Sequence, residues 1–93
     1  MDKLRIGAID YSVKRVKRLW DKTHNSGEIH YFDSEIILDK SLDKQQTRQT
    51  LWHEIIHAVL FNGSYNDHDE QMVQIISNGI VQVLRDNPEL RGE

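Results

Sequence analysis

The feature that most constrains the fold is a long stretch, from Ser41 to Phe61, that contains no glycine and no proline. Apolar residues recur in it at three- and four-residue spacing, which is typical of one face of an α-helix. They are Leu51, Ile55, Ala58 and Leu60. Ser41 or Asp43 can cap the start of this helix, and Asn62-Gly63 is typical of its end.

Within this predicted helix lies the run TLWHEIIHAV, which contains the pattern His-Glu-x-x-His. Residues four positions apart lie on the same face of a helix, so His53 and His57 can direct two imidazoles at one point. Zinc accepts imidazole nitrogen, and catalytic zinc usually has three protein ligands and a water. Glu54 can reach that water as a general base without binding the metal itself. The alternative is an amphipathic helix that carries two partly exposed histidines.

A third ligand has to come from another element, because no histidine follows at the spacing of the longer His-Glu-x-x-His-x-x-Gly-x-x-His pattern. The candidates are Asp67, His68, Asp69 and Glu70. Glu70 is in phase with Val73 and Ser77 on the expected buried stripe of the next helix. A carboxylate at position 67 or 69 better suits a solvent-facing first turn, where it complements the helix dipole. We predict Glu70 as the third ligand, with Asp69 and His68 as the alternatives.

The second predicted helix follows Asn66 or Asp67, either of which can cap it, and ends before Pro88. Its expected apolar stripe is Val73, Ile76, Ile80 and Leu84. Gly79 lies inside this helix, where glycine costs about 1 kcal/mol relative to alanine. We expect that Gly79 permits close packing of the two helices.

The N-terminal half reads as extended chain. Alternating apolar residues between Leu4 and Val16 predict strands, with a bend at Gly7. The alternative for the second part of this segment is a helix across Lys14 to Lys22, with Val16, Leu19 and Trp20 on one face. After the turn residues Asn25 to Gly27, two short apolar runs predict a β-hairpin that turns near Asp33 and Ser34. The fold class is therefore α+β, a small N-terminal antiparallel sheet followed by two packed helices, within a single domain spanning residues 1–93.

Composition excludes several classes of function. The formal charge is −3 and the chain has no cysteine, so nucleic acid is an unlikely partner and no thiolate metal site exists. The basic run from Val13 to Arg18 is best explained as a solvated face of the N-terminal half. No apolar run approaches the ~20 residues of a membrane span, and the first residues lack the apolar core of a signal peptide. We expect a cytoplasmic protein without a membrane partner.

The runs GEIHYFDSEIILDKSL, TLWHEIIHAVL and DEQMVQIISNGIVQVLRDNP together resemble the small phage-borne zincin metallopeptidases. These are similar to the minimal gluzincin-type fold and to the peptidase domain of the ImmA/IrrE metallo-endopeptidases. The resemblance spans most of residues 27–88. It implies a small sheet over the motif helix, His53, His57 and Glu70 as ligands, Glu54 as base, and the host cytoplasm as location if the chain is phage-encoded.

The expected function is hydrolysis of a peptide or protein substrate by a zinc-bound water that Glu54 activates. The alternative is a zinc-binding regulatory or interaction module without turnover. We expect the strand before Asp39 and Lys40 to border the cleft, where an extended peptide can pair with it. The candidates for stabilising the oxyanion are His30, Tyr65 and His68. The sequence does not indicate an oligomeric state.

Overall fold

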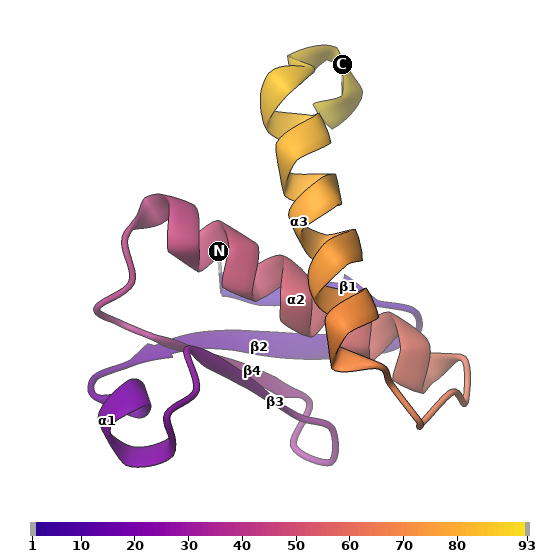
Figure 1. Ribbon diagram of the computed structural model, residues 1–93. Helices are drawn as coiled ribbons and strands as arrows, with labels where there is room; N and C mark the ends of the chain where they lie inside the picture. Colours follow the sequence, from indigo (N-terminus) through magenta and orange to yellow (C-terminus); the bar gives the residue numbers. More distant parts are fainter. Residues whose placement is uncertain (1, 93) are drawn as a thin grey trace.

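The computed structural model describes residues 2–92 and has two layers, a four-stranded sheet and a helical layer (Figure 1). The strands are β1 (Lys3–Ile6), β2 (Ile9–Val16), β3 (Gly27–His30) and β4 (Glu35–Asp39). The helices are α1 (Leu19–Thr23), α2 (Lys44–Asn62) and α3 (Glu70–Asp86), followed by a 3-10 turn, η1 (Pro88–Arg91). Helix α2 lies across the sheet, and α3 packs on α2 and projects away from it.

The α+β prediction is confirmed, but the sheet is mixed, whereas we expected an antiparallel one. The strand order is β1-β2-β4-β3, and β2 pairs with β4 in parallel. The two antiparallel pairs are the hairpins β1–β2 and β3–β4, and the second turns at residues 31–34 as predicted. Alternation within a strand cannot reveal which strand lies next to it, which is why the parallel pairing was missed.

This strand order also corrects the expected substrate edge. The strand before Asp39 and Lys40 is β4, which pairs on both sides and offers no free edge. The edge strand on this side of the sheet is β3. A Cβ added to Gly27, in β3, would come within 2.5 Å of the Thr50 side chain, so glycine allows β3 to approach α2 closely.

Two capping arrangements set the start of the long helices. Asp43 caps α2 in a capping box with Gln46, as one of the two predicted candidates. Helix α3 begins two or three residues later than the predicted caps would place it, because Asp69 accepts hydrogen bonds from the backbone N–H groups of Gln71 and Met72. The prediction of Asn66 or Asp67 as the cap was therefore wrong.

The packed face of α3 also differs from the expected stripe. Its buried residues are Val73, Ser77 and Val81. Of the expected stripe, only Val73 is buried, and Ile76 is 43% exposed. A Cβ at Gly79 would meet no atom within 4 Å, so Gly79 is not the point at which the two helices pack.

The core lies between the sheet and α2. Its buried members are Ile6, Tyr11, Ile36, Leu38 and Ala58. Among the described residues, no helix is both long enough and apolar enough to cross a membrane.

Candidate metal centre

The three predicted ligands meet at one point, although they come from two helices. His53 and His57 project from adjacent turns of α2, and Glu70 is the first residue of α3. The Nε2 atom of His53 lies 3.1 Å from Oε1 of Glu70, and the Nε2 atom of His57 lies 3.0 Å from Oε2. The two Nε2 atoms are 3.3 Å apart.

These distances fit a metal ion. Four ligands placed tetrahedrally at the zinc–nitrogen distance of about 2.0–2.1 Å lie roughly 3.3 Å from one another. The two Nε2 atoms, and each Nε2 atom with the Glu70 oxygen nearest to it, are separated by close to that length. This group can therefore hold a metal ion.

The alternative ligands have other positions. Asp69 is the N-cap of α3, and its carboxylate is engaged with backbone N–H groups. His68 contacts Nδ1 of His57, the ring nitrogen that does not face Glu70. Neither residue joins the group that converges on the point between the two Nε2 atoms.

Glu54 lies beside this group in the same cleft. The residue is only 7% exposed, yet it lines both the hollow over the metal centre and the neighbouring one. Burial, reinforced by the negative charges of Glu70 and Glu28, raises the pKa of Glu54 to about 7. No hydrogen bond from another described residue holds its carboxyl group, so the group is available to a bound molecule.

The pKa values of His57 and Glu70 are both lowered, for different reasons. Burial lowers the pKa of His57 from its ordinary value, which favours the neutral ring that a metal requires. Partial burial alone would raise the pKa of Glu70, but His57 and His53 outweigh it and lower that pKa. Neutral imidazoles and an ionised carboxylate are the protonation states that bind a divalent cation.

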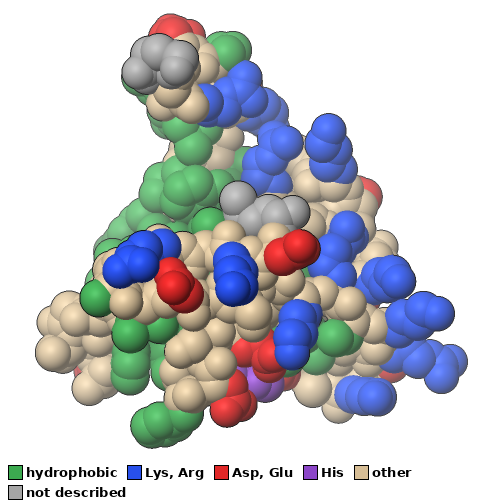
Figure 2. Space-filling view, turned by 180° about the vertical axis from the view of Figure 1, so that it is seen from behind, with side chains coloured by type: hydrophobic (Ala, Val, Ile, Leu, Met, Phe, Trp, Pro, Cys, Tyr) green, Lys and Arg blue, Asp and Glu red, His purple; other side chains and the backbone are tan. Residues whose placement is uncertain are grey.

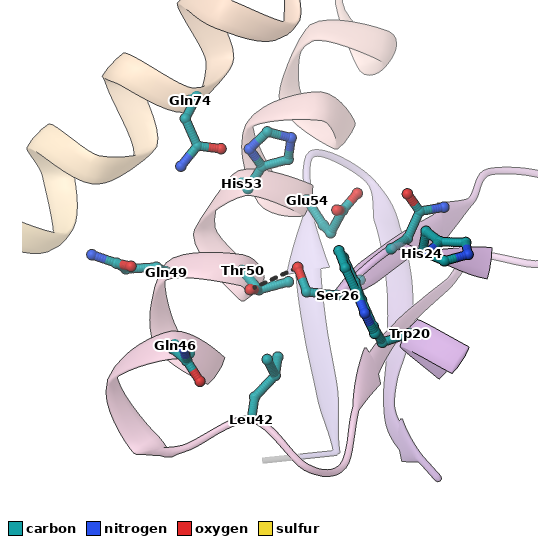
Figure 3. A pocket seen from close by; sticks show the side chains of 12 residues that line it. Trp20, His24, Ser26, Leu42, Gln46, Gln49, Thr50, His53, Glu54 and Gln74 are labelled. Atoms are coloured by element: carbon teal, nitrogen blue, oxygen red, sulfur yellow. Dashed lines mark hydrogen bonds between the residues drawn. The ribbon is translucent and has the colours of Figure 1, made fainter. Parts of the chain in front are cut away.

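The cleft extends along α2 away from the metal centre. This arm has a volume of about 340 Å³ and contains His53 and Glu54 at one end. Figure 3 shows Trp20, His24 and Ser26 facing Gln46, Gln49 and Thr50 of α2 across it, with Gln74 of α3 at its rim. Apart from Glu54 and the histidines, the side chains that line this arm carry no charge.

Edge strand β3 forms the opposite wall of the hollow over the metal centre. That hollow is lined by Gly27, Glu28, Ile29 and His30 together with the metal-binding group and Glu54. Tyr31, directly after the strand, lines the same hollow and stacks on Phe61 at a centroid distance of 4.0 Å. Burial, and then the charge of Glu54, raise the pKa of the Tyr31 hydroxyl, so it remains a donor.

Sequence reasoning missed Tyr31 as a residue of the site, and it assigned the oxyanion role to others. His30 bonds to Glu28, and His68 contacts the far nitrogen of His57 and the carbonyl oxygen of Tyr65. The signal for Tyr31 was present in the alternation of the hairpin. Tyr31 continues the alternation that begins at Ile29, one residue beyond the end of β3, and Ile29 packs on the core.

No family model, curated protein or solved structure matches this chain. The resemblance to zincin metallopeptidases therefore remains a hypothesis, and the functional argument depends on the geometry of the site.

Proposed function

We propose that this protein is a zinc-dependent metallopeptidase. The observation that carries the proposal is one cleft that combines three convergent metal donors, a buried carboxyl group and a sheet edge. His53, His57 and Glu70 would hold the ion. When bound there, zinc would polarise the peptide carbonyl and lower the pKa of a water molecule.

Glu54 supplies the proton transfers. Its carboxylate takes a proton from the attacking water and then donates it to the nitrogen of the leaving amine, so the group ends as it began. The buried position of Glu54 favours this role, because a carboxyl group that is poorly solvated holds a proton more readily than one in water. The hydroxyl of Tyr31 is the described donor best placed to stabilise the oxyanion.

The substrate is an extended peptide. Edge strand β3 can add such a peptide by main-chain hydrogen bonds, and this would lay the peptide along the wall opposite Glu54. Flanking side chains would then enter the uncharged arm of the cleft beside Trp20. We propose this strand as the substrate edge in place of β4.

The decisive experiment compares zinc-loaded wild type with Glu54→Gln on an unfolded protein substrate, with products identified by mass spectrometry. We expect Glu54→Gln to keep one zinc per chain and to lose activity by about 10²–10⁴-fold, because its amide cannot accept the proton. Glu89→Gln, the same change on the distant turn η1, should remain fully active.

The outcomes separate the proposal from its rival. If wild type binds zinc but cuts no substrate, the protein is the metal-binding interaction module without turnover. If Glu54→Gln cuts as fast as wild type, Glu54 is not the base. If Glu54→Gln loses the metal, Glu54 has a structural or ligand role and the assignment above is wrong.

A further inference from the structure

His68 is close to the metal centre but is not part of the convergent donor group. Its Nδ1 atom lies 2.7 Å from Nδ1 of His57, and its Nε2 atom contacts the main-chain carbonyl oxygen of Tyr65. The rings of His57 and His68 are stacked, with centroids 4.9 Å apart and planes inclined by 21°. The His57 side chain is 9% exposed, so water has little access to it.

Counting hydrogen-bond donors and acceptors indicates which ring nitrogens carry a proton along the contacts from the Tyr65 carbonyl through His68 to His57. A carbonyl oxygen only accepts, so Nε2 of His68 carries the proton that it donates to Tyr65. Nδ1 of neutral His68 is then an acceptor, and Nδ1 of His57 must donate to it. Neutral His57 then has no proton on Nε2. Its lone pair can accept from the Nε2–H of His53 at 3.3 Å, and Oε2 of Glu70, 3.0 Å away, is the acceptor that competes with His68 for the single proton of His57.

His53 has no such partner. Its Nδ1 atom is buried and makes no hydrogen bond to any described residue, while its Nε2 atom contacts the Glu70 carboxylate. A carboxylate is an acceptor, so in the metal-free protein the His53 proton belongs on Nε2. His53 must move this proton before it can bind a metal through Nε2, whereas His57 need not.

We propose that His68, through the Tyr65 carbonyl, is a positioning residue that fixes His57 as the metal-ready tautomer. The proposal rests on the proposed function to the extent that His57 is a metal ligand. A metal-binding histidine normally donates its second ring N–H to an oxygen acceptor or to water, which holds the ring and its tautomer. Here a histidine is the acceptor, and its own orientation is set by the loop before α3.

The first test is made on the metal-free protein, by long-range proton–nitrogen correlation spectra of ¹⁵N-histidine. The measurement is made about two units above the ordinary histidine pKa, where the rings are neutral. We expect protonated Nδ1 on His57 and protonated Nε2 on both His53 and His68. A His57 ring protonated at Nε2 would overturn the proposal.

The second test measures zinc affinity by competition with a chromogenic chelator. His68→Phe keeps an aromatic ring but removes the acceptor, so His57 should lose its single tautomer and zinc affinity should fall about 10–100-fold. His68→Asn places an amide oxygen near the position of Nδ1 and should restore most of the affinity. One control should match wild type in zinc affinity: Glu89→Gln, on the distant turn η1.

The outcomes are distinct from those of the peptidase assay. Wild-type zinc affinity in folded His68→Phe, or an equal loss in His68→Asn, would overturn the positioning role. If wild type bound no zinc, the proposed function would fail, and the spectra of the metal-free protein would still decide the tautomer of His57.

Discussion

Helices α2 and α3 use their buried faces in different ways. The buried residues of α2 are Glu54, His57 and Ala58, so two of the three are polar groups of the candidate site. Helix α3 buries Val73, Ser77 and Val81, while several of its larger apolar side chains are exposed. Figure 2 shows hydrophobic side chains along the projecting helix. The exposed apolar residues of α3 include Ile75, Ile76 and Val83.

The contrast teaches that side chains are buried for different reasons in the two helices. Buried polar groups are costly unless they are paired or bind an ion, so the buried polar residues of α2 fit the proposed metal site better than a role in stability. Helix α3 packs on α2 and projects from it, and several of its apolar side chains lie outside the packed face. Substitutions on the two helices should therefore separate metal binding from stability.

The largest expected effect is on α2. The double variant His53→Ala, His57→Ala removes two of three ligands and should weaken zinc binding by at least about three powers of ten. Elemental analysis after metal loading and gel filtration measures it. The double variant Met72→Ala, Ile75→Ala on the exposed surface of α3 should keep one zinc per chain. Equal zinc content in both double variants would show that the metal binds elsewhere.

The next effect tests the one ligand that α3 supplies. Glu70→Gln keeps the shape of the side chain and removes its charge, so zinc affinity should fall by one or more powers of ten. Asp69→Asn retains a capping side chain and should lose only a helix-dipole contribution of about 0.3–1 kcal/mol. Competition with a chromogenic chelator compares the two. A greater loss of affinity in Asp69→Asn would place the third ligand one residue earlier.

A stability comparison follows on α3 itself. Val73 is 1% exposed, and truncating it to alanine removes two buried methyl groups, which should cost about 2 kcal/mol. Ile76→Ala removes more atoms from an exposed position and should change the free energy of unfolding by less than about 0.5 kcal/mol. Urea unfolding of the metal-free protein measures both. Should Ile76→Ala prove the more destabilising, the exposed apolar face is covered in solution.

The sequence was sufficient to predict the features of the fold that depend on residues close together in the chain. Neighbouring residues determine the helical pattern of α2, its cap at Asp43 and the second hairpin. They also determine that the side chains of His53 and His57 lie on the same face of α2. The carboxylate of Glu70 does lie with His53 and His57, although its side chain is 70% exposed and not on the buried stripe where we expected it. Its role as a ligand stays a prediction.

The remaining features depend on contacts between distant segments. The parallel pairing of β2 with β4 makes β3 the edge strand, and no local pattern distinguishes this order from others. The expected stripe of α3 was wrong beyond Val73, because periodicity marks an apolar face but not where that face meets another element. The contact of His68 with His57 depends on the loop between the helices, which carries no periodic signal.

The smallest expected effect concerns Gly79, in the part of α3 that projects from the molecule. Glycine inside a helix is less stable than alanine by about 0.5–1 kcal/mol, because the unfolded chain has more conformations to lose. A Cβ at this position would meet no atom within 4 Å, so alanine can be accommodated without any shift of its neighbours.

Gly79→Ala should therefore stabilise the protein by up to about 1 kcal/mol, which for a domain of this size raises the melting temperature by roughly 4–8 °C. Zinc affinity should not change, since Gly79 is not among the metal donors, which are two residues of α2 and the first residue of α3. Calorimetry of wild type and variant at several protein concentrations provides the measurement. Destabilisation by alanine would contradict the open position of Gly79, and a loss that grew with protein concentration would show that another molecule packs against it.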